Sequence, residues 1–534
     1  MEKGKDARRE FLETGIAALG LALGGPANAF RMQRGPARKV AADFNVRDFG
    51  TTGDGRTLDS LSINEAIAAA AAVGGGTVYL PSGVYLCHSI HLKNNVALQF
   101  SSGAIVLAAG PQETNGGSEG YDHPESNNPG KEYQDFGHSH WHNSLIWGES
   151  LENISICGPG LIWGKGISRG EFQGPIAEIP GVANKTIALK NCHGVILRDF
   201  SILHGGHFGI LTTGVDNLTI DNVKIDTNRA GIDMDCCRNV RVSNCSINAP
   251  WDDAICLKSS LALGFARAAE MITISNCMVS GSFEEGSLLD GTFKRFPPDA
   301  DIDRNGRIKL GTESNGGFKN ITITNCVFDG CFGLALLSVD GAVIEDITIS
   351  NITMRDTVSS PIFIRLGSRM RGFAGLPIGA IRRVNISNLV SSGASSLICS
   401  MIAGIPGHRI EDLKLSNILL KHPGGGTKKE AVRHLDENEK EYPEVDMFGN
   451  TPAHGFFIRH AKGVELSNCK VIASKDARPC FFLVDVEQVD FVNVKTERAA
   501  DTPVFVLDQV KGFRVVNCAP LADTQIADAK QLEL

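Results

Sequence analysis

This sequence has few charged and few aromatic residues. Only 21% of its 534 residues are Asp, Glu, Lys or Arg, 7% are Phe, Trp or Tyr, and the formal net charge is −8. A chain without a basic surplus is not expected to bind nucleic acid, whose phosphates favour positively charged proteins. It also lacks CxxC pairs at zinc-finger spacing, and beyond the N-terminus no stretch has the roughly 18 apolar residues of a membrane span. We therefore expect no structural metal, no cofactor and no membrane span in the mature protein.

The N-terminus has the features of an export signal. Arg8-Arg9-Glu-Phe-Leu12 resembles a twin-arginine motif, and an apolar run leads to the cleavage-type segment Ala27-Asn28-Ala29. We expect residues 1–29 to be a signal, residues 30–43 a linker, and the mature protein to be periplasmic or secreted. The alternative is a short apolar helix that stays in the mature protein.

Short strand-like segments repeat from about residue 150 onward. Val195–Ile202, Leu218–Ile225 and Val240–Ile247 alternate β-branched and polar residues, lie about 22 residues apart, and are followed by copies near 272, 321, 347, 384, 413 and 464. Alternation indicates strands, and a unit this small buries a core only by stacking on its neighbours. The sequence therefore predicts an all-β solenoid over residues 44–530. A leucine-rich repeat is disfavoured because no L-x-x-L-x-L pattern recurs.

Asparagine and cysteine occupy a fixed place in these repeats. Asn precedes Cys245, Cys277, Cys326, Cys469 and Cys518. Asn tolerates the left-handed backbone conformation, and stacked amides can form a hydrogen-bonded ladder. We expect most of the fourteen cysteines to be buried free thiols, with one or two local bridges left open.

The start of the mature chain and two long polar segments differ from the repeats. Residues 59–73 predict a helix with Ser or Asp as cap, ended by Gly74-Gly-Gly76, which would cover the open end of the solenoid. Residues 110–143 and 421–453 predict loops that project from the stack and form cleft walls.

Three carboxylates lie at the ends of neighbouring strand-like segments. Asp233 closes Asn228-Arg-Ala-Gly-Ile-Asp233, and Asp252-Asp253 opens the next strand, which contains Lys258. Glycoside hydrolysis uses such carboxyl groups, one to protonate the leaving oxygen and one to activate water. Two carboxylates held close are expected to raise one pKa, which would suit the acid.

These segments resemble glycoside hydrolase family 28, the polygalacturonase and rhamnogalacturonase group of right-handed parallel β-helices. The resemblance implies that Asp252 is the general acid and that Asp253 and Asp233 activate water in an inverting hydrolysis. The family's Asn-Thr-Asp-Gly motif becomes Asn228-Arg-Ala-Gly, so its first aspartate is replaced by Ala230. Its Gly-His-Gly histidine falls near Asn305, and its Arg-Ile-Lys motif is expected around Gly333–Ser338, where Ala335 and Leu337 stand.

A pectic substrate carries carboxylates, so the resemblance also implies cations and polar groups along the cleft. The candidates for substrate binding are Lys258, Arg365, His207, Asn228 and Arg307. A cluster at His123, His138, His140 and His142 is a metal site or a polar cleft edge.

Two other functions remain open for the same fold. A polysaccharide lyase would use a cation to acidify the uronate and Arg or Lys as base. A non-catalytic carbohydrate-binding solenoid is favoured by Ala230 and by the missing Arg-Ile-Lys motif.

Overall fold

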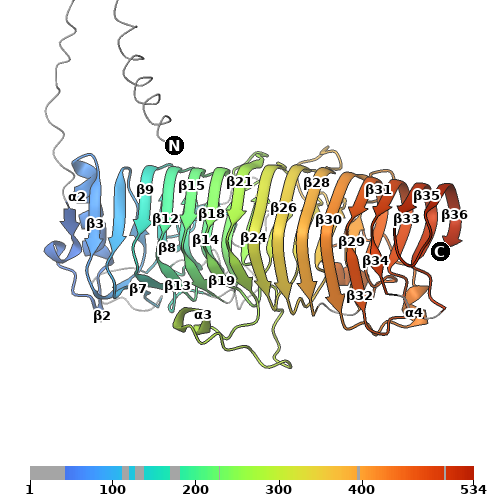
Figure 1. Ribbon diagram of the computed structural model, residues 1–534. Coiled ribbons are helices and arrows are strands. Elements are labelled where there is room, and N and C mark those ends of the chain that lie inside the picture. Colours follow the sequence, from blue (N-terminus) through green and yellow to red (C-terminus); the bar gives the residue numbers. More distant parts are fainter. Residues whose placement is uncertain are drawn as a thin grey trace, which may run out of the picture. The chain divides into compact units, whose positions relative to one another are not determined.

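The computed structural model describes residues 43–110, 120–126, 138–168, 181–227, 229–393, 397–497, 499 and 501–534. These residues form the predicted solenoid, a parallel β-helix of pectin-lyase-like type, whose coils follow one another from α2 to β36 (Figure 1). The expected signal at 1–29 and the linker as far as residue 42 lie outside the described residues.

Each coil contributes strands to three parallel faces, which we call the site face, the long face and the third face. The site face runs through β5 (Ile90–His91), β8 (Ser144–Glu149), β11 (Lys185–Lys190), β14 (Phe208–Thr213), β17 (Ala230–Asp235), β20 (Ile255–Ser259), β23 (Ile308–Ser314), β25 (Leu334–Ser338), β27 (Ile362–Leu366), β29 (Ser400–Ala403), β31 (Phe456–Ser467), β33 (Phe481–Val492) and β35 (Phe505–Val516).

The long face contains the strands that carry most of the repeat pattern. It runs through β1 (Asp43–Asn45), β3 (Gly76–Leu80), β6 (Val96–Phe100), β9 (Glu152–Cys157), β12 (His193–Arg198), β15 (Asp216–Asp221), β18 (Arg238–Ser243), β21 (Ala269–Ser275), β24 (Phe318–Asp329), β26 (Val343–Arg355), β28 (Ala380–Ser392) and β30 (Ile410–His422).

The third face is made of short strands and of the C-terminal parts of β24, β26, β28 and β30. Its own strands are β2 (Asp54–Leu58), β4 (Gly83–Cys87), β7 (Ala104–Ala108), β10 (Leu161–Trp163), β13 (Ser201–Leu203), β16 (Lys224–Asp226), β19 (Ser246–Asn248), β22 (Met278–Ser280), β32 (Lys470–Ala473) and β34 (Lys495–Thr496).

The register of the site face separates an apolar interior from a functional exterior. Ile187, Ile210, Ile232, Ile255 and Ile308 pair in sequence from strand to strand and are fully buried. Since side chains alternate along a strand, the neighbouring positions point outward. Coil stacking therefore builds the core and presents an outer row at the same time.

The repeated asparagines occupy the positions expected of them. Asn276, Asn325, Asn351, Asn388 and Asn417 all have positive φ. Each amide Nδ2 after the first donates to the Oδ1 of the preceding coil's asparagine, at 2.9–3.2 Å. All fourteen cysteines are buried free thiols, as expected for most of them.

Both ends of the stack are covered. At the N-terminal end α2 (Ser60–Ala72) follows η1 (Val46–Phe49) and buries Ile63, Ala66, Ile67 and Ala70. Asp59 precedes the helix but does not cap it, because its carboxylate accepts hydrogen bonds from the backbone N–H groups of Thr52 and Gly53. At the other end β36 (Thr524–Glu533) pairs antiparallel with β35, which covers the last parallel edge.

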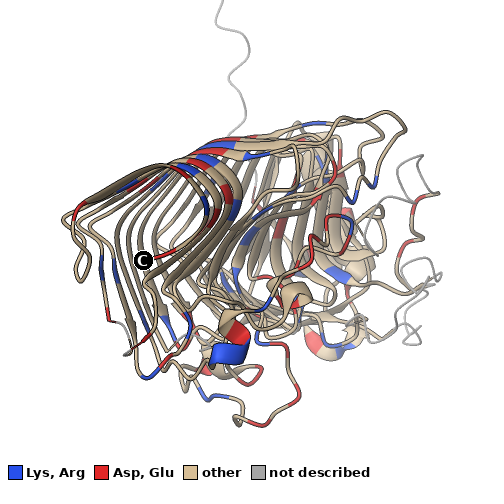
Figure 2. Cartoon of the chain, turned by 90° about the vertical axis from the view of Figure 1, so that its right-hand side faces the viewer, with Lys and Arg blue, Asp and Glu red and all other residues tan. Residues whose placement is uncertain are grey.

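Charged residues gather along the outer ridges and on the loops when the stack is viewed along its axis (Figure 2). The expected loop at 421–453 carries α4 (Lys428–Ala431) and η4 (Val445–Phe448), while α3 (Ser287–Asp290) belongs to an insertion between β22 and β23 (Figure 1). Of the loop expected at 110–143, residues 111–119 and 127–137 lie outside the described residues. No helix among the described residues is long and apolar enough to cross a membrane.

Candidate active site

The outer row of the site face brings the predicted carboxylates together. Asp233 pairs with Cys256, and Cys256 pairs with Lys309. Burial raises the pKa of the Cys256 thiol, and the charges that act on this thiol include those of Asp233 and Asp253. Asp233 and Asp253 therefore act on the same side chain of the site face, and Asp252 lies beside Asp253 in the turn that leads into β20.

Asp253 is a buried anion held by two cations. It is 2% exposed, accepts a hydrogen bond from Nε of Arg307 at 3.0 Å, and forms an ion pair with Lys309. Arg307 also pairs with Glu444 in the 421–453 loop. Arg307 therefore ties that loop to Asp253 and is not free to receive a substrate carboxylate, contrary to our expectation.

Asp252 is the accessible member of the pair. Its side chain is 22% exposed, and Arg229 donates from Nη2 to its Oδ2 at 2.9 Å. Its turn is braced by the backbone N–H of Gly306, which donates to the Asp252 carbonyl at 2.9 Å. Burial acts to raise the pKa of Asp252, but Arg229 and Lys309 outweigh it and hold that pKa below its ordinary value.

The expectation that crowding would raise the pKa of one aspartate of the pair is therefore wrong for Asp252. Nearby cations lower the pKa of Asp252, and their positions could not be inferred from the sequence. The pKa of Asp303 is raised by partial desolvation and by the negative charge of Asp252.

Asp233 is buried beneath His138, which belongs to the loop predicted at 110–143. It is 1% exposed, and its Oδ2 lies 3.1 Å from Nε2 of His138 and 3.9 Å from Nζ of Lys258. Its Oδ1 has no hydrogen-bond partner among the described residues. Burial and Lys258 act to lower the pKa of His138, but Asp233 and Glu313 raise it overall, which favours the imidazolium.

Three other residues predicted to bind substrate are Lys258, His207 and Asn228. Lys258 is buried and paired with Glu313 and Asp233. His207 is buried, and desolvation, Arg229 and His138 hold its pKa well below the ordinary value. Asn228 lies outside the described residues.

Arg365 does not serve as the predicted uronate partner. Its side chain is 1% exposed, and its guanidinium donates to the carbonyl oxygens of Gly404 and Glu437. It therefore fastens the 421–453 loop to β27. The sequence pattern could not separate a cation that faces a cleft from one that holds a loop.

Ala230 lies where the resemblance places an aspartate, and its surroundings are apolar. It is buried and packs in a cluster with Trp141, Phe208 and Leu211. The missing carboxylate has therefore been replaced by a hydrophobic contact between the first loop and the site face.

Sequence reasoning also missed a motif that is present. Arg307-Ile308-Lys309 spells out the Arg-Ile-Lys triplet at the start of β23, one strand before the expected position in β25. Its two cations are the partners of Asp253. The triplet could have been found directly in the sequence. The resemblance placed it in β25, which is the next strand of the site face after β23.

The histidine cluster does not form one group. His138 faces Asp233, whereas His142, Glu125 and Glu149 bring ligand-type atoms within 4.8 Å of one another. Lys190 lies 2.9 Å from Glu149 and supplies positive charge there. Lys190 therefore offsets part of the negative charge of this second group.

Comparison with known proteins agrees with the fold. Residues 44–255 match the family model described as rhamnogalacturonase A/epimerase, pectate lyase-like. A probable polygalacturonase of Vitis vinifera is 22% identical over 404 residues, which cover 71% of this chain and 74% of that protein. The exopolygalacturonase of Thermotoga maritima superposes with a TM-score of 0.57 at 17% identity, over 92% of this chain and 95% of that one, and shows the shared fold.

A shorter segment is more similar to other enzymes. Mannuronan C5-epimerase AlgE3 of Azotobacter vinelandii is 47% identical over 72 residues, which are 14% of this chain and 4% of that protein. The chain thus spans a small fraction of the epimerases that it matches. Both the polygalacturonase and the epimerase carry the names of carbohydrate-active enzymes.

Proposed function

We propose that this protein hydrolyses a glycosidic bond in a uronate-containing, pectic type of glycan, and that the reaction takes place on the site face at β17, β20 and β23. The observation that carries the proposal is the accessible Asp252 carboxylate beside Asp253, which Arg307 and Lys309 hold in place. Glycoside hydrolysis uses one carboxyl group as acid and one as base, and the opposite pKa shifts of Asp252 and Asp303 favour such a division.

The charge environment supports a revised division of roles. The lowered pKa keeps Asp252 ionised, which suits a base that accepts a proton from the attacking water. Asp303, whose pKa is raised, is the candidate for the acid that protonates the leaving oxygen. Asp253 positions its neighbour, and Asp233 lies buried beneath His138, which it holds at 3.1 Å.

Arg229 is the cation best placed for a uronate carboxylate. It is about one-third exposed and lies directly beside Asp252. A guanidinium can bind a carboxylate through two parallel hydrogen bonds, which fixes the orientation of the sugar as well as binding it.

An elimination reaction is the second candidate. Arg229 offers a partly exposed cation on this part of the face, and Ala230 stands where the resemblance places a carboxylate that activates water. A lyase neutralises a uronate carboxylate in order to remove the adjacent proton.

Product analysis separates these reactions. Polygalacturonate, rhamnogalacturonan and alginate are each incubated with wild-type protein, Asp252→Asn, and Asp299→Asn as a matched exposed control. New reducing ends without the ultraviolet absorbance of unsaturated uronides, lost only in Asp252→Asn, are expected. An absorbing product would establish elimination, and binding without any product would overturn catalysis.

A further inference from the structure

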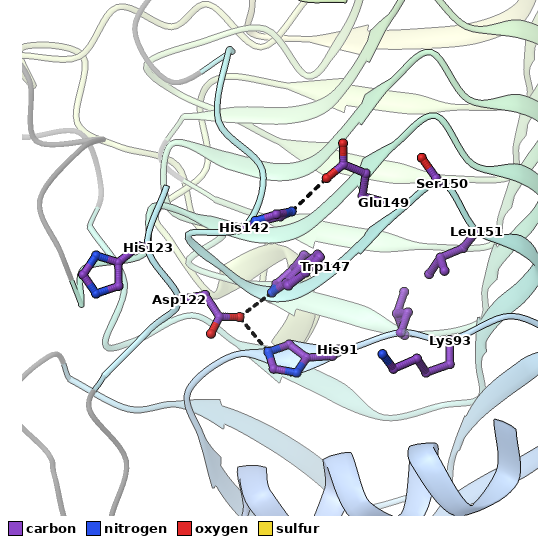
Figure 3. A pocket seen from close by; sticks show the side chains of 10 residues that line it. His91, Lys93, Asp122, His123, His142, Trp147, Glu149, Ser150 and Leu151 are labelled. Atoms are coloured by element: carbon purple, nitrogen blue, oxygen red, sulfur yellow. Dashed lines mark hydrogen bonds and ion pairs between the residues drawn. The ribbon is translucent and has the colours of Figure 1, made fainter. Parts of the chain in front are cut away.

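A cavity of about 630 Å³ opens on the same site face, nearer the N-terminal end (Figure 3). Its lining residues are His91, Leu92, Lys93, Asp122, His123, His142, Trp147, Glu149, Ser150 and Leu151. A volume of this size is within the range of ligand-binding clefts.

The cavity and Asp233 belong to the same outer row. Trp147 pairs with Ala188, Ala188 with Leu211, and Leu211 with Asp233. Three strand spacings of roughly 4.8 Å separate Trp147 from Asp233, or about 14 Å along the stack. A distance of this order is within the length of a short oligosaccharide, which would pass over the buried Ala188 and Leu211 and the Trp141 that packs on them.

The cavity wall is fixed by a network around Trp147. The indole Nε1 donates to Asp122 at 2.7 Å, and Asp122 also lies 2.6 Å from Nε2 of His91. The ring of His142 stacks on Trp147 with 3.9 Å between centroids. The polar groups are therefore held in place before any ligand arrives, which reduces the entropy lost on binding.

The charges of the lining indicate what kind of ligand fits. Burial acts to raise the pKa of Asp122, but His91 and Trp147 lower it overall. Burial opposes Lys190 and His142 at Glu149, whose pKa is also lowered. Both carboxylates are thus kept ionised, and they are hydrogen-bond acceptors only. They can accept hydrogen bonds from hydroxyl groups, while Lys93 in the lining and Lys190 beside Glu149 offset part of their negative charge.

We infer that this cavity binds an uncharged, hydroxyl-rich sugar residue of the glycan whose bond is cleaved near Asp252. Asp122 and Glu149 accept hydrogen bonds from its hydroxyl groups, and the exposed Lys93 donates one from the rim. This inference rests on the proposed function and extends it, because a substrate that fills both positions combines a uronate near Arg229 with a neutral sugar at the cavity.

Two matched probes test the inference without requiring catalysis. A galactose disaccharide and the corresponding galacturonic acid disaccharide are titrated by NMR into wild-type full-length protein, Glu149→Gln, Lys93→Gln, and Glu152→Gln as an exposed control. The neutral disaccharide is expected to bind about tenfold more weakly to Glu149→Gln, and more weakly to Lys93→Gln, with no change in Glu152→Gln. Lys93 is exposed, so its variant still reports if Glu149→Gln fails to fold.

The outcomes distinguish this inference from the proposed hydrolysis. No binding of the neutral disaccharide to wild-type protein, or equal binding by all four proteins, overturns the cavity assignment even if Asp252-dependent hydrolysis is present. Preferential binding of the charged disaccharide that is lost in Glu149→Gln overturns it as well. Neutral binding with the expected losses supports the cavity assignment even if hydrolysis is absent.

Discussion

Arg307 donates from Nε to Oδ1 of Asp253 across 3.0 Å, although the two residues lie 54 positions apart in the chain. Lys309 pairs with the same carboxylate, and all three side chains are almost fully buried. The contact joins the turn before β20 to the start of β23, so the geometry of Asp252 depends on it.

Removing the Asp253 charge should destabilise the protein strongly. Asp253→Asn leaves Arg307 and Lys309 without their shared buried partner, and breaking a buried pair typically costs about 3–5 kcal/mol. A clear drop in the urea midpoint is expected. The control is Asp490→Asn at the exposed pair with Arg514, where a change below about 1 kcal/mol is expected. Similar small effects in both variants would show that Asp253 is not a structural anchor.

Replacing Asp252 should remove turnover and leave the fold intact. Asp252→Asn keeps the shape but not the base, and general acid–base catalysis contributes about 10²–10⁴-fold. Because the pKa of Asp252 is lowered, wild-type activity should persist below the ordinary aspartate pKa before its acid limb falls. A pH–rate profile of kcat/KM checks this, and an acid limb well above the ordinary value would contradict it.

Restoring the absent aspartate should not restore a water site. Ala230→Asp places a carboxylate among Trp141, Phe208 and Leu211, and an unpaired buried charge is costly. A lower Tm and no gain in turnover are expected, with Ala230→Val as the apolar control. Higher activity at an unchanged Tm would mean that the site accepts the ancestral arrangement.

The contact between His138 and Asp233 should make stability depend on pH. The pKa of His138 is raised in the folded state, so its stabilising effect is complete below the unfolded pKa of about 6.5 and is lost as pH rises through the folded pKa. The difference in unfolding free energy between wild type and His138→Gln should therefore shrink from pH 6 to pH 9. His193→Gln at an exposed position is the control. A difference that grows with pH would contradict this assignment.

The fold could be predicted from the sequence because each coil repeats the same pattern of strands and turns. Alternating Ile, Val and Thr residues and left-handed Asn positions specify local structure, and stacking follows from them. The row that contains Asp233 and the turn that contains Asp252 could be predicted for the same reason.

The chemistry of the site depends on contacts that a repeat does not encode. His138 contacts Asp233 although the two residues lie 95 positions apart in the chain. Arg365 donates hydrogen bonds to the carbonyl oxygen of Gly404, just after β29, and to that of Glu437 in the 421–453 loop. Burial acts to raise the pKa of Asp252, and Arg229 and Lys309, which approach from different coils, lower it overall. Such contacts lower the pKa of Asp252, which we expected to be raised. They also bury Arg307 and Arg365, which we expected to face the substrate.

Oxygen labelling tests the proposed hydrolysis most directly. Wild-type protein is incubated with a responsive glycan in H₂¹⁸O, and the masses of the first products are measured by mass spectrometry. The account predicts fragments that gain one labelled water at the new reducing end, at a rate that Asp252→Asn abolishes. Unlabelled unsaturated fragments, or labelled fragments formed equally well by Asp252→Asn, would contradict it.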